Sequence, residues 1–304
     1  MYGTRFIKST DSGDRNQTMN QPIQEIIEQR YSCRSYIDKQ IQETHRQALH
    51  NFIMAHRIGP LGTQARFELV TATQDDRKSL KGLGTYGFIK NPTGFIIGAL
   101  KQGPKNLEEY GYLLEHIILC ATDIGLGTCW LGGSFTKSSF AKKVSLRDEE
   151  TIPAVISTGY SVKKNGTREW TRSYWKANRR FPIDQLFFAD IFGNPLTMEA
   201  AGLYAQPLEM VQWAPSASNK QPWRIVRSGN AWNFYLERTK GYGKETLLFK
   251  MLRLADLQRV DIGIAMCHFE LTARSLGLRG RWIEEDPKIK LKENTEYTIT
   301  WMNE

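Results

Sequence analysis

The sequence predicts an α+β protein made of two similar halves, each holding a sheet flanked by helices. Two observations support this prediction. Strand-like runs rich in β-branched and aromatic residues alternate with long apolar runs typical of buried helices, in two comparable rounds along the chain. The two long helical runs also match each other without a gap, at a constant shift of 152 positions. A chain of 304 residues can bury one large core or two smaller ones.

The first twenty residues are polar and lack a clean period, so residues 1–20 are expected to form a frayed tail. The segment QPIQEIIEQR then has Pro22 near a helix start and isoleucines at helical spacing. Strands are predicted at 66–73, 93–100 and 152–160 in the first round, and at 222–229, 231–238 and 296–302 in the second. The long buried helices are predicted at 109–125, closed by glycine, and at 260–277, and we expect them to pack against each other across a pseudo-twofold axis.

The repeat is clearest where GYLLEHIILCATDIGLGTCWL (residues 111–131) is placed over GIAMCHFELTARSLGLRGRWI (residues 263–283). Average composition would give roughly one or two matches by chance. Seven of the 21 positions are identical: Gly111/Gly263, His116/His268, Leu119/Leu271, Ala121/Ala273, Gly125/Gly277, Leu126/Leu278 and Trp130/Trp282. With one gap, Pro60 also aligns with Pro215 and Phe67 with Trp223. Two unrelated buried helices that both end in Gly-Leu are the alternative.

Composition and charge set limits on function. The apolar fraction is 40% and the net charge is +9. Because no apolar run reaches the roughly 18 residues of a membrane span and no signal pattern opens the chain, we expect a cytoplasmic protein without membrane contact. Neither CxxC pairs nor His/Cys metal spacings occur, which predicts buried thiols and no metal site. The cysteines are Cys33, Cys120, Cys129 and Cys267.

The basic charge could suit nucleic acid, since phosphate attraction drives non-specific binding. The basic residues are scattered, however, and the densest cluster, TRSYWKANRR at residues 171–180, is on its own more typical of a solvated loop. A phosphorylated cofactor accounts for a few cations more simply, so we expect no nucleic-acid partner.

The segment QRYSCRSY contains a candidate anion site. If the chain is extended after Arg30, the side chains of Arg30, Ser32 and Arg34 fall on one side, because strand side chains alternate. Two guanidiniums and a hydroxyl suit a phosphate. A solvated basic turn is the alternative.

The segment GLGTCWLGGSF, residues 125–135, follows the first long helix. Gly125 or Gly127 can end that helix in a left-handed conformation, and Gly132 and Gly133 would let backbone N–H groups approach a ligand closely. A helix cap followed by a buried strand is the alternative, although it explains the Gly-Gly pair less well. Both histidines of the repeat, His116 and His268, lie in apolar helices, which favours core hydrogen bonding over proton transfer.

Four separated blocks together resemble one family, the FMN-dependent nitroreductases. RYSCRSY resembles the family's Arg-x-Ser-x-Arg/Lys element, and APSASNKQPW, residues 214–223, resembles its Ala/Ser-Pro-Ser-x-x-Asn-x-Gln-Pro-Trp loop. GLGTCWLGG is similar to the segment beside the flavin ring. IPAVISTGY followed by NRRFPIDQLF is similar to the Ile-Pro strand and the later basic stretch, and implies a phosphate contact for Arg180. The blocks cover most of residues 22–304.

The resemblance implies how the chain is organised. Nitroreductases are usually homodimers with FMN at the subunit interface, and here the two contributions are divided between the halves. Residues 21–195 would supply the phosphate and N5 side of the flavin, and residues 196–304, a degenerate half, would supply the APSASN loop. The chain would then be a fused pseudo-dimer with a nitroreductase-like fold, monomeric, with one FMN and one lost site.

The resemblance also implies an activity: NADH or NADPH would pass hydride to flavin N5, and a nitroaromatic, quinone or similar electron-poor acceptor would take the electrons. Arg34 would stabilise charge on the reduced ring, and no catalytic side chain is predicted. A flavin carrier or sensor without turnover, or a different flavin reaction, stays open. The cofactor-binding residues are predicted to be Arg30, Ser32, Arg34, Leu131, Gly132, Gly133, Arg180, Pro215, Ser216, Ala217 and Asn219.

Overall fold

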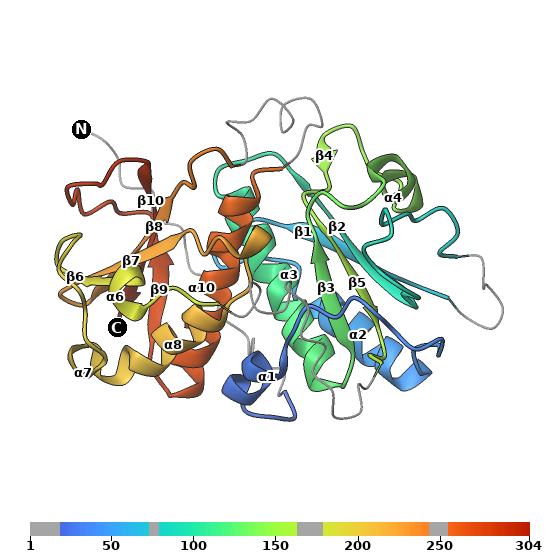
Figure 1. The fold of residues 1–304 in the computed structure, drawn as a ribbon, viewed down its shortest axis with the longest axis horizontal. Helices are drawn as coiled ribbons and strands as arrows, with labels where there is room; N and C mark the ends of the chain where they lie inside the picture. Colours follow the sequence, from blue (N-terminus) through green and yellow to red (C-terminus); the bar gives the residue numbers. More distant parts are fainter. Residues whose placement is uncertain (1–18, 73–78, 163–178, 243–254) are drawn as a thin grey trace.

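Two five-stranded sheets stand on either side of a central pair of long helices (Figure 1). The computed structural model describes residues 19–72, 79–162, 179–242 and 255–304. The predicted tail and the predicted basic cluster at 171–180 therefore lie mostly outside the described residues. Asn20, at the end of the predicted tail, donates its backbone N–H to the Asp123 carboxylate at 2.8 Å.

The first sheet has the strand order β1-β2-β5-β3, with β4 beside β2, and all of its pairings are antiparallel. Helix α3 leads from β2 to β3, and α1, α2 and α4 complete this part of the chain. The elements are α1 (Ile23–Gln29), α2 (Glu43–Ala55), β1 (Ala65–Thr71), β2 (Gly94–Lys101), α3 (Asn106–Asp123), β3 (Gly127–Leu131), α4 (Lys137–Lys143), β4 (Glu150–Thr151) and β5 (Val155–Gly159).

The second sheet has the order β6-β7-β8-β10-β9, in which β6 alone runs parallel to its neighbour. Without β6, the order β7-β8-β10-β9 of the second sheet corresponds to the order β1-β2-β5-β3 of the first sheet. Helix α10 leads from β8 to β9, as α3 leads from β2 to β3. The elements are α6 (Ile183–Leu186), β6 (Phe187–Ala189), α7 (Met198–Ala201), η1 (Gly202–Tyr204), α8 (Ala205–Trp213), η2 (Ala217–Asn219), β7 (Trp223–Ser228), β8 (Ala231–Glu237), α10 (Leu257–Ser275), β9 (Gly280–Ile283) and β10 (Thr295–Asn303).

The strands and both long helices predicted from periodicity are confirmed, with helix limits that begin three residues earlier than expected. Gly125 ends α3 at φ +80°, as predicted for a left-handed cap, and Gly277 ends α10 in the same way at φ +74°. Strand β3 matches the alternative of a cap followed by a buried strand. Helices α2, α4, α6, α7 and α8 and strands β4, β6 and β9 were not predicted. Strand β6 lies before the predicted boundary at residue 195, yet it pairs with β7 of the second sheet.

Helices α3 and α10 touch backbone to backbone where Gly111 meets Gly263. A Cβ atom added at Gly111 would lie 2.1 Å from the Val260 carbonyl oxygen, and one added at Gly263 would lie 1.8 Å from the Glu108 carbonyl oxygen. Only glycine leaves room for this approach. Both helices are buried along nearly their whole length, and their apolar side chains join one core cluster that continues into both sheets. Tight packing at one crossing therefore unites the two parts of the chain.

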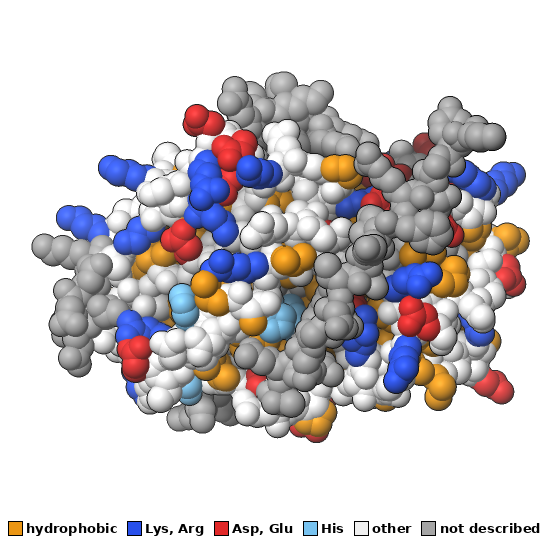
Figure 2. All heavy atoms as spheres, turned by 180° about the vertical axis from the view of Figure 1, so that it is seen from behind, with side chains coloured by type: hydrophobic (Ala, Val, Ile, Leu, Met, Phe, Trp, Pro, Cys, Tyr) orange, Lys and Arg blue, Asp and Glu red, His pale blue; other side chains and the backbone are white. Residues whose placement is uncertain are grey.

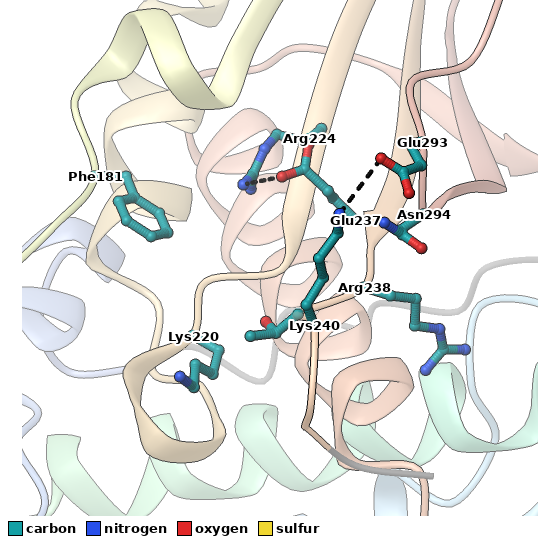
Figure 3. A pocket seen from close by; sticks show the side chains of 9 residues that line it. Phe181, Lys220, Arg224, Glu237, Arg238, Lys240, Glu293 and Asn294 are labelled. Atoms are coloured by element: carbon teal, nitrogen blue, oxygen red, sulfur yellow. Dashed lines mark hydrogen bonds and ion pairs between the residues drawn. The ribbon is translucent and has the colours of Figure 1, made fainter. Parts of the chain in front are cut away.

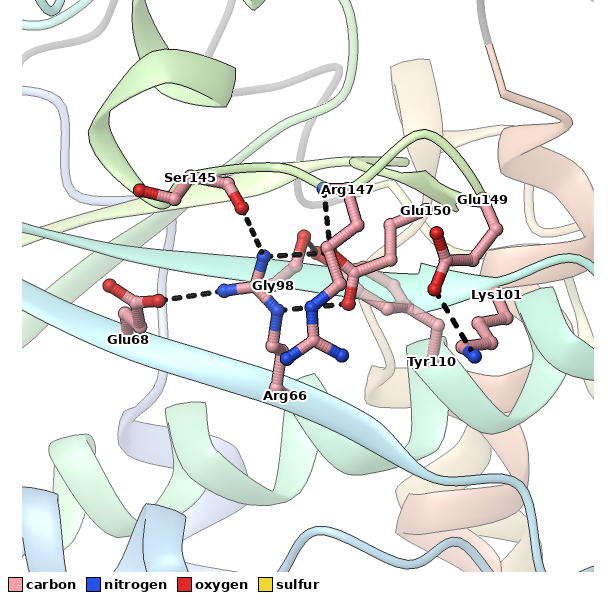
Figure 4. Close-up of polar contacts among 9 residues, drawn as sticks. All are labelled: Arg66, Glu68, Gly98, Lys101, Tyr110, Ser145, Arg147, Glu149 and Glu150. Atoms are coloured by element: carbon pink, nitrogen blue, oxygen red, sulfur yellow. Dashed lines mark hydrogen bonds and ion pairs between the residues drawn. The ribbon is translucent and has the colours of Figure 1, made fainter.

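An arginine-carboxylate pair fastens the edge of the first sheet (Figure 4). Arg66 of β1 donates from Nε to Glu150 Oε1 at 2.9 Å and from Nη2 to Glu150 Oε2 at 2.7 Å, and it also reaches Glu68 at 2.7 Å. Glu150 lies in β4, the short strand on the other side of β2. These hydrogen bonds from Arg66 lower the pKa of Glu150 to about 2, so the carboxylate stays charged at neutral pH.

Charged side chains on the visible face in Figure 2 occur in several mixed groups, with acidic residues among the Lys and Arg side chains rather than one continuous basic surface. All four cysteines are buried and free, as predicted. Within the described residues, every helix is too short or too polar to cross a membrane.

Replacing either crossing glycine tests how far the fold depends on this contact. We expect Gly111→Ala and Gly263→Ala each to lower the free energy of unfolding by at least about 2 kcal/mol, because the clash is with backbone that cannot move aside. This cost exceeds the roughly 1 kcal/mol that alanine gains in helix propensity. The midpoint of urea unfolding measures it. Gly103→Ala is the control: its added Cβ meets nothing within 4 Å, so the midpoint should hold or rise slightly.

Candidate functional site

The predicted anion-binding segment follows α1 as extended chain beside β3. Ser32 pairs with Thr128 of β3, and the Cys33 N–H donates to the Thr128 carbonyl at 2.8 Å. Cys33 is buried, whereas Ser32 and Arg34 are exposed, which is the alternation predicted for extended backbone. Arg34 lies beside Cys129 of β3: burial raises the pKa of the Cys129 thiol, and the charge of Arg34 opposes that rise.

Arg30, the C-cap residue of α1, points its guanidinium at a buried carboxylate of α3. Its Nε atom lies 3.6 Å from Glu115 Oε1. Trp130 of β3 donates its indole N–H to Glu115 Oε2 at 2.7 Å, and His268 Nε2 of α10 lies 3.0 Å from Oε1. Burial alone would raise the pKa of Glu115, but the hydrogen bond from His268 and the charge of Arg30 hold it below its usual value. Glu115 is therefore an ionised carboxylate that gathers groups from three elements.

His268 is fully buried and is held by two partners. Its Nδ1 atom lies 2.8 Å from the Met210 carbonyl oxygen, which can only accept a hydrogen bond. Its Nε2 atom lies opposite the Glu115 carboxylate of α3, so this side chain links α10 to α3 and to the end of α8. The prediction that His268 makes core hydrogen bonds is confirmed. His116 is also buried, and packs edge-on against the rings of Phe52 and His56.

Arg180 lies between Arg30 and the Pro215–Asn219 loop of the second half. Its Nη1 atom donates to Asn219 Oδ1 at 3.2 Å, and its Nη2 atom donates to the Trp213 carbonyl at 3.1 Å. Asn219 in turn donates from Nδ2 to the Arg179 carbonyl at 2.8 Å. Burial, together with the nearby charge of Arg30, lowers the pKa of Arg180 to about 10. Two guanidiniums thus lie close enough to repel each other, an arrangement that a bound anion would relieve.

The loop from Pro215 to Asn219 is held in a tight 3-10 turn that follows α8. Ser218 and Asn219 both have left-handed φ angles, +52° and +54°, a conformation that asparagine tolerates well. Ser216 Oγ accepts the Gln221 N–H at 2.8 Å, and the Ala217 N–H is donated to Asp261 of α10 at 2.9 Å. The loop is therefore anchored to the N-terminal part of α10.

Leu131 is the last residue of β3 and is buried, and Gly132 and Gly133 follow it. A Cβ atom at Gly132 would lie 2.4 Å from Leu257 Cδ1, the first residue of α10. Leu257 therefore packs directly against Gly132, a contact that the sequence did not suggest. Gly133 is exposed.

The predicted residues from the two halves thus meet around the start of α10. Arg30 and Asn219, 189 positions apart in the sequence, are linked through Arg180, which donates a hydrogen bond to Asn219 and whose pKa is lowered in part by the charge of Arg30. Ser32 and Arg34 lie beside β3, where Ser32 pairs with Thr128 and Arg34 lies near Cys129. Glu115 and Asp261 were missed. Their signal was present in the sequence, because a carboxylate inside an apolar helix is rarely buried without a partner.

A cavity of about 410 Å³ opens next to this arrangement, on the second sheet (Figure 3). Phe181 and Lys220, the neighbours of Arg180 and Asn219, form part of its wall, but none of the predicted cofactor-binding residues lines it. Its cations are largely compensated by carboxylates. Arg224 lies 3.0 Å from Glu237, and Lys240 lies 3.4 Å from Glu293.

Comparison with known proteins decides the family. Residues 22–273 match the sequence profile of the family described as "Putative TM nitroreductase". The chain belongs to this nitroreductase family. No curated protein matches its sequence.

A solved structure with a TM-score above 0.5 supports a nitroreductase fold. A "putative nitroreductase" from Thermotoga maritima MSB8 aligns over 93% of this chain and 94% of its own, with 22% identity and a TM-score of 0.59, and at this identity the likeness concerns the fold alone. A "putative nitroreductase in complex with FMN" from Desulfovibrio desulfuricans covers 53% of this chain and 99% of its own, with 20% identity and a TM-score of 0.39.

Removing the charge of Glu115 tests the buried cluster. We expect Glu115→Gln to lower the free energy of unfolding by about 3–5 kcal/mol, because His268 and Arg30 would lose the carboxylate that compensates them. Because the folded pKa of Glu115 is depressed, this stabilisation is present above its usual value of 4.5 and is lost as the pH falls through the folded pKa. The difference between wild type and variant in urea unfolding should therefore shrink in acid.

Glu68→Gln is the matched control. Glu68 also faces an arginine, but its side chain is 45% exposed, so its loss should cost no more than about 1 kcal/mol. Equal losses for the two variants would contradict the role assigned to Glu115.

Proposed function

We propose that the protein is an FMN-dependent oxidoreductase that takes electrons from NADH or NADPH and passes them to a nitroaromatic, a quinone or a similar electron-poor acceptor. Membership of a nitroreductase family supports the reaction class. The observation that carries the proposal is the meeting of Arg30, Arg180 and Asn219, because it brings cations from one half to the loop of the other. Those are the two contributions that the family resemblance assigns to a flavin site.

The residues present fit a phosphorylated flavin. Arg30 and Arg180 would bind the phosphate, since closely placed guanidiniums suit its charge and geometry, and Ser32 would add a hydroxyl donor. Backbone N–H groups from Leu131 to Gly133 would face N5. Arg34 would lie at the pyrimidine edge of the ring and stabilise negative charge there. The ribityl and dimethylbenzene side would be closed by Pro215, Ser216, Ala217 and Asn219.

We also infer that one chain is a fused pseudo-dimer with a single flavin site. The common strand order of the two sheets supports a duplication, as does the crossing of two long helices at glycines that occupy equivalent repeat positions. The left-handed Gly125 and Gly277 occupy equivalent positions as well. On this proposal residues 21–195 and 196–304 replace the two subunits of a homodimer, so the protein would be a monomer.

The bound FMN would supply the redox chemistry, accepting hydride from the nicotinamide and releasing electrons to the acceptor. The chain's own residues would place the cofactor and exclude water. Glu115, itself held by His268, would fix the guanidinium of Arg30 and the indole of Trp130. Positioning rather than acid or base chemistry would set the rate.

Purified protein tests the proposal directly. We expect a yellow protein with one FMN per chain, whose absorbance is bleached by NADH or NADPH without oxygen and returns when a nitroaromatic or quinone is added. Bound flavin that neither nicotinamide reduces would indicate a carrier or sensor instead. Protein that binds no FMN would exclude the proposed function.

Arg180 allows a sharper test through the phosphate. We expect Arg180→Gln to weaken FMN binding by about 10- to 100-fold, the effect of losing a hydrogen bond to a charged group, while riboflavin, which lacks the phosphate, is affected much less. Fluorescence titration of both flavins measures the ratio of affinities. Arg281→Gln, on an exposed arginine of β9, is the control and should leave both affinities unchanged. Equal losses for FMN and riboflavin would remove Arg180 from the phosphate site.

A further inference from the structure

Two carboxylates occupy equivalent places in the two halves. Glu109 of α3 and Asp261 of α10 are separated by 152 positions, and each comes two residues before the glycine at the helix crossing. Each accepts backbone N–H groups from the loop that precedes the first long strand of its half. These loops are residues 59–63 and 214–218, which align through Pro60 and Pro215.

Both side-chain oxygens of Glu109 accept hydrogen bonds from the loop of residues 59–63. Oε1 accepts the Leu61 N–H at 2.6 Å and Oε2 accepts the Thr63 N–H at 2.5 Å. Both oxygens therefore accept backbone N–H groups of this loop. The first-half loop is closed onto its helix.

Only one of the two side-chain oxygens of Asp261 accepts a hydrogen bond from its loop. Oδ1 accepts the Ala217 N–H at 2.9 Å, whereas Oδ2 is buried and has no hydrogen-bond partner in the part of the chain that the structure describes. The residue is 2% exposed. A buried polar atom of this kind calls for a partner, because leaving it unpaired is costly.

Asp261 belongs to the stretch of α10 that contacts segments from both halves. Leu257, one helical turn before Asp261 and on the same face of α10, packs against Gly132 of the first half. Asp261 itself accepts the Ala217 N–H from the Pro215–Asn219 loop of the second half. The residue with the free oxygen therefore holds one predicted flavin-binding segment and lies one helical turn from the contact with the other.

The surroundings of Asp261 favour its neutral form. Among the described residues, the charged or titratable groups that act on it or respond to it are Asp256, at the start of α10, and Tyr242, from the segment after β8. Asp256 is itself paired with Arg238 at 2.7 Å, so no described cation compensates Asp261. Burial with a single N–H donor raises the pKa of Asp261 well above its usual value.

We propose that Asp261 is a neutral carboxylic acid whose Oδ2–H donates a hydrogen bond to an acceptor atom of the flavin, a carbonyl or hydroxyl oxygen or a ring nitrogen. Its other oxygen, Oδ1, keeps the Ala217 loop in place. This makes Asp261 a cofactor-binding residue contributed by the second half. The inference rests on the proposed function, because the ligand is the flavin of that site.

Isosteric replacement tests the direction of this hydrogen bond. In Asp261→Asn the amide oxygen can still accept the Ala217 N–H, and the amide N–H₂ can donate in place of Oδ2–H, so FMN affinity should stay within about threefold of wild type. Asp261→Ala should weaken FMN binding about tenfold or more, because the donor is lost. Fluorescence titration gives both affinities.

The pH dependence separates a donor from an acceptor. Wild-type FMN affinity should fall as the pH rises through the pKa of Asp261 in the folded protein, while Asp261→Asn should show no such fall over the same range. If instead the variant binds FMN tenfold more weakly and wild-type affinity rises with pH, Asp261 is an ionised acceptor and the proposal is overturned.

Amide variants of Glu109 and Asp261 can be compared by their stability in the absence of flavin. Glu109→Gln should lower the urea midpoint of the flavin-free protein, because an amide N–H₂ would face a backbone N–H. Asp261→Asn should not lower it. The raised pKa of Asp261 means that its stabilising neutral form is lost as the pH rises, so the variant should gain on wild type toward alkaline pH. An equal loss of midpoint in both variants would overturn the proposal.

FMN binding by the wild-type protein distinguishes failure of the proposed function from failure of the role proposed for Asp261. Wild-type protein that binds no FMN would overturn the proposed function together with this assignment. Wild-type protein that binds FMN, while Asp261→Ala binds it equally well, would overturn the role of Asp261 alone.

Discussion

The backbone contact between α3 and α10 is the constraint on which the rest of the structure depends. A methyl group at Gly111 or Gly263 would overlap carbonyl oxygens of the facing helix, so the two helices can approach this closely only with glycine at both places. The close approach sets the relative position of everything the helices carry. It brings His268 of α10 to Glu115 of α3, and it places the start of α10 against Gly132. The candidate site is thus a consequence of helix packing.

Charge is distributed unevenly around this crossing. At the edge of the first sheet, Arg66 and Glu150 form a bidentate pair that satisfies both groups and holds strands together. At the crossing, a single carboxylate, Glu115, serves His268, Arg30 and Trp130 at once. Arg180 lies close enough to Arg30 for repulsion to lower its pKa. Positive charge therefore accumulates where a phosphate is proposed to bind, and the core supplies the rigid support that keeps it there.

Equivalent positions need not keep equivalent roles. Glu109 closes its loop with both oxygens, while the shorter Asp261 holds its loop with one and leaves the other buried and unpaired. A difference of one methylene group thus separates a purely structural carboxylate from one able to meet a ligand. On the proposed pseudo-dimer, this is the chemical trace of two copies specialising after duplication: one loop became part of the scaffold, and the other remained part of the site.

The sequence by itself determined six of the strands (β1, β2, β5, β7, β8 and β10), both central helices with the glycine end of α3, and the segments of the candidate site, because these follow from local periodicity, backbone conformation and short motifs. Helices α2 and α8 escaped prediction; they have 13 and 9 residues, and helices this short are stabilised mainly by tertiary packing. Only the tertiary structure decided that β6 joins the second sheet, that Leu257 packs against Gly132, that His268 meets Glu115 and that Asp261 holds the Ala217 loop. Each depends on a contact between residues far apart in the chain, and local sequence carries no record of which distant group will meet it.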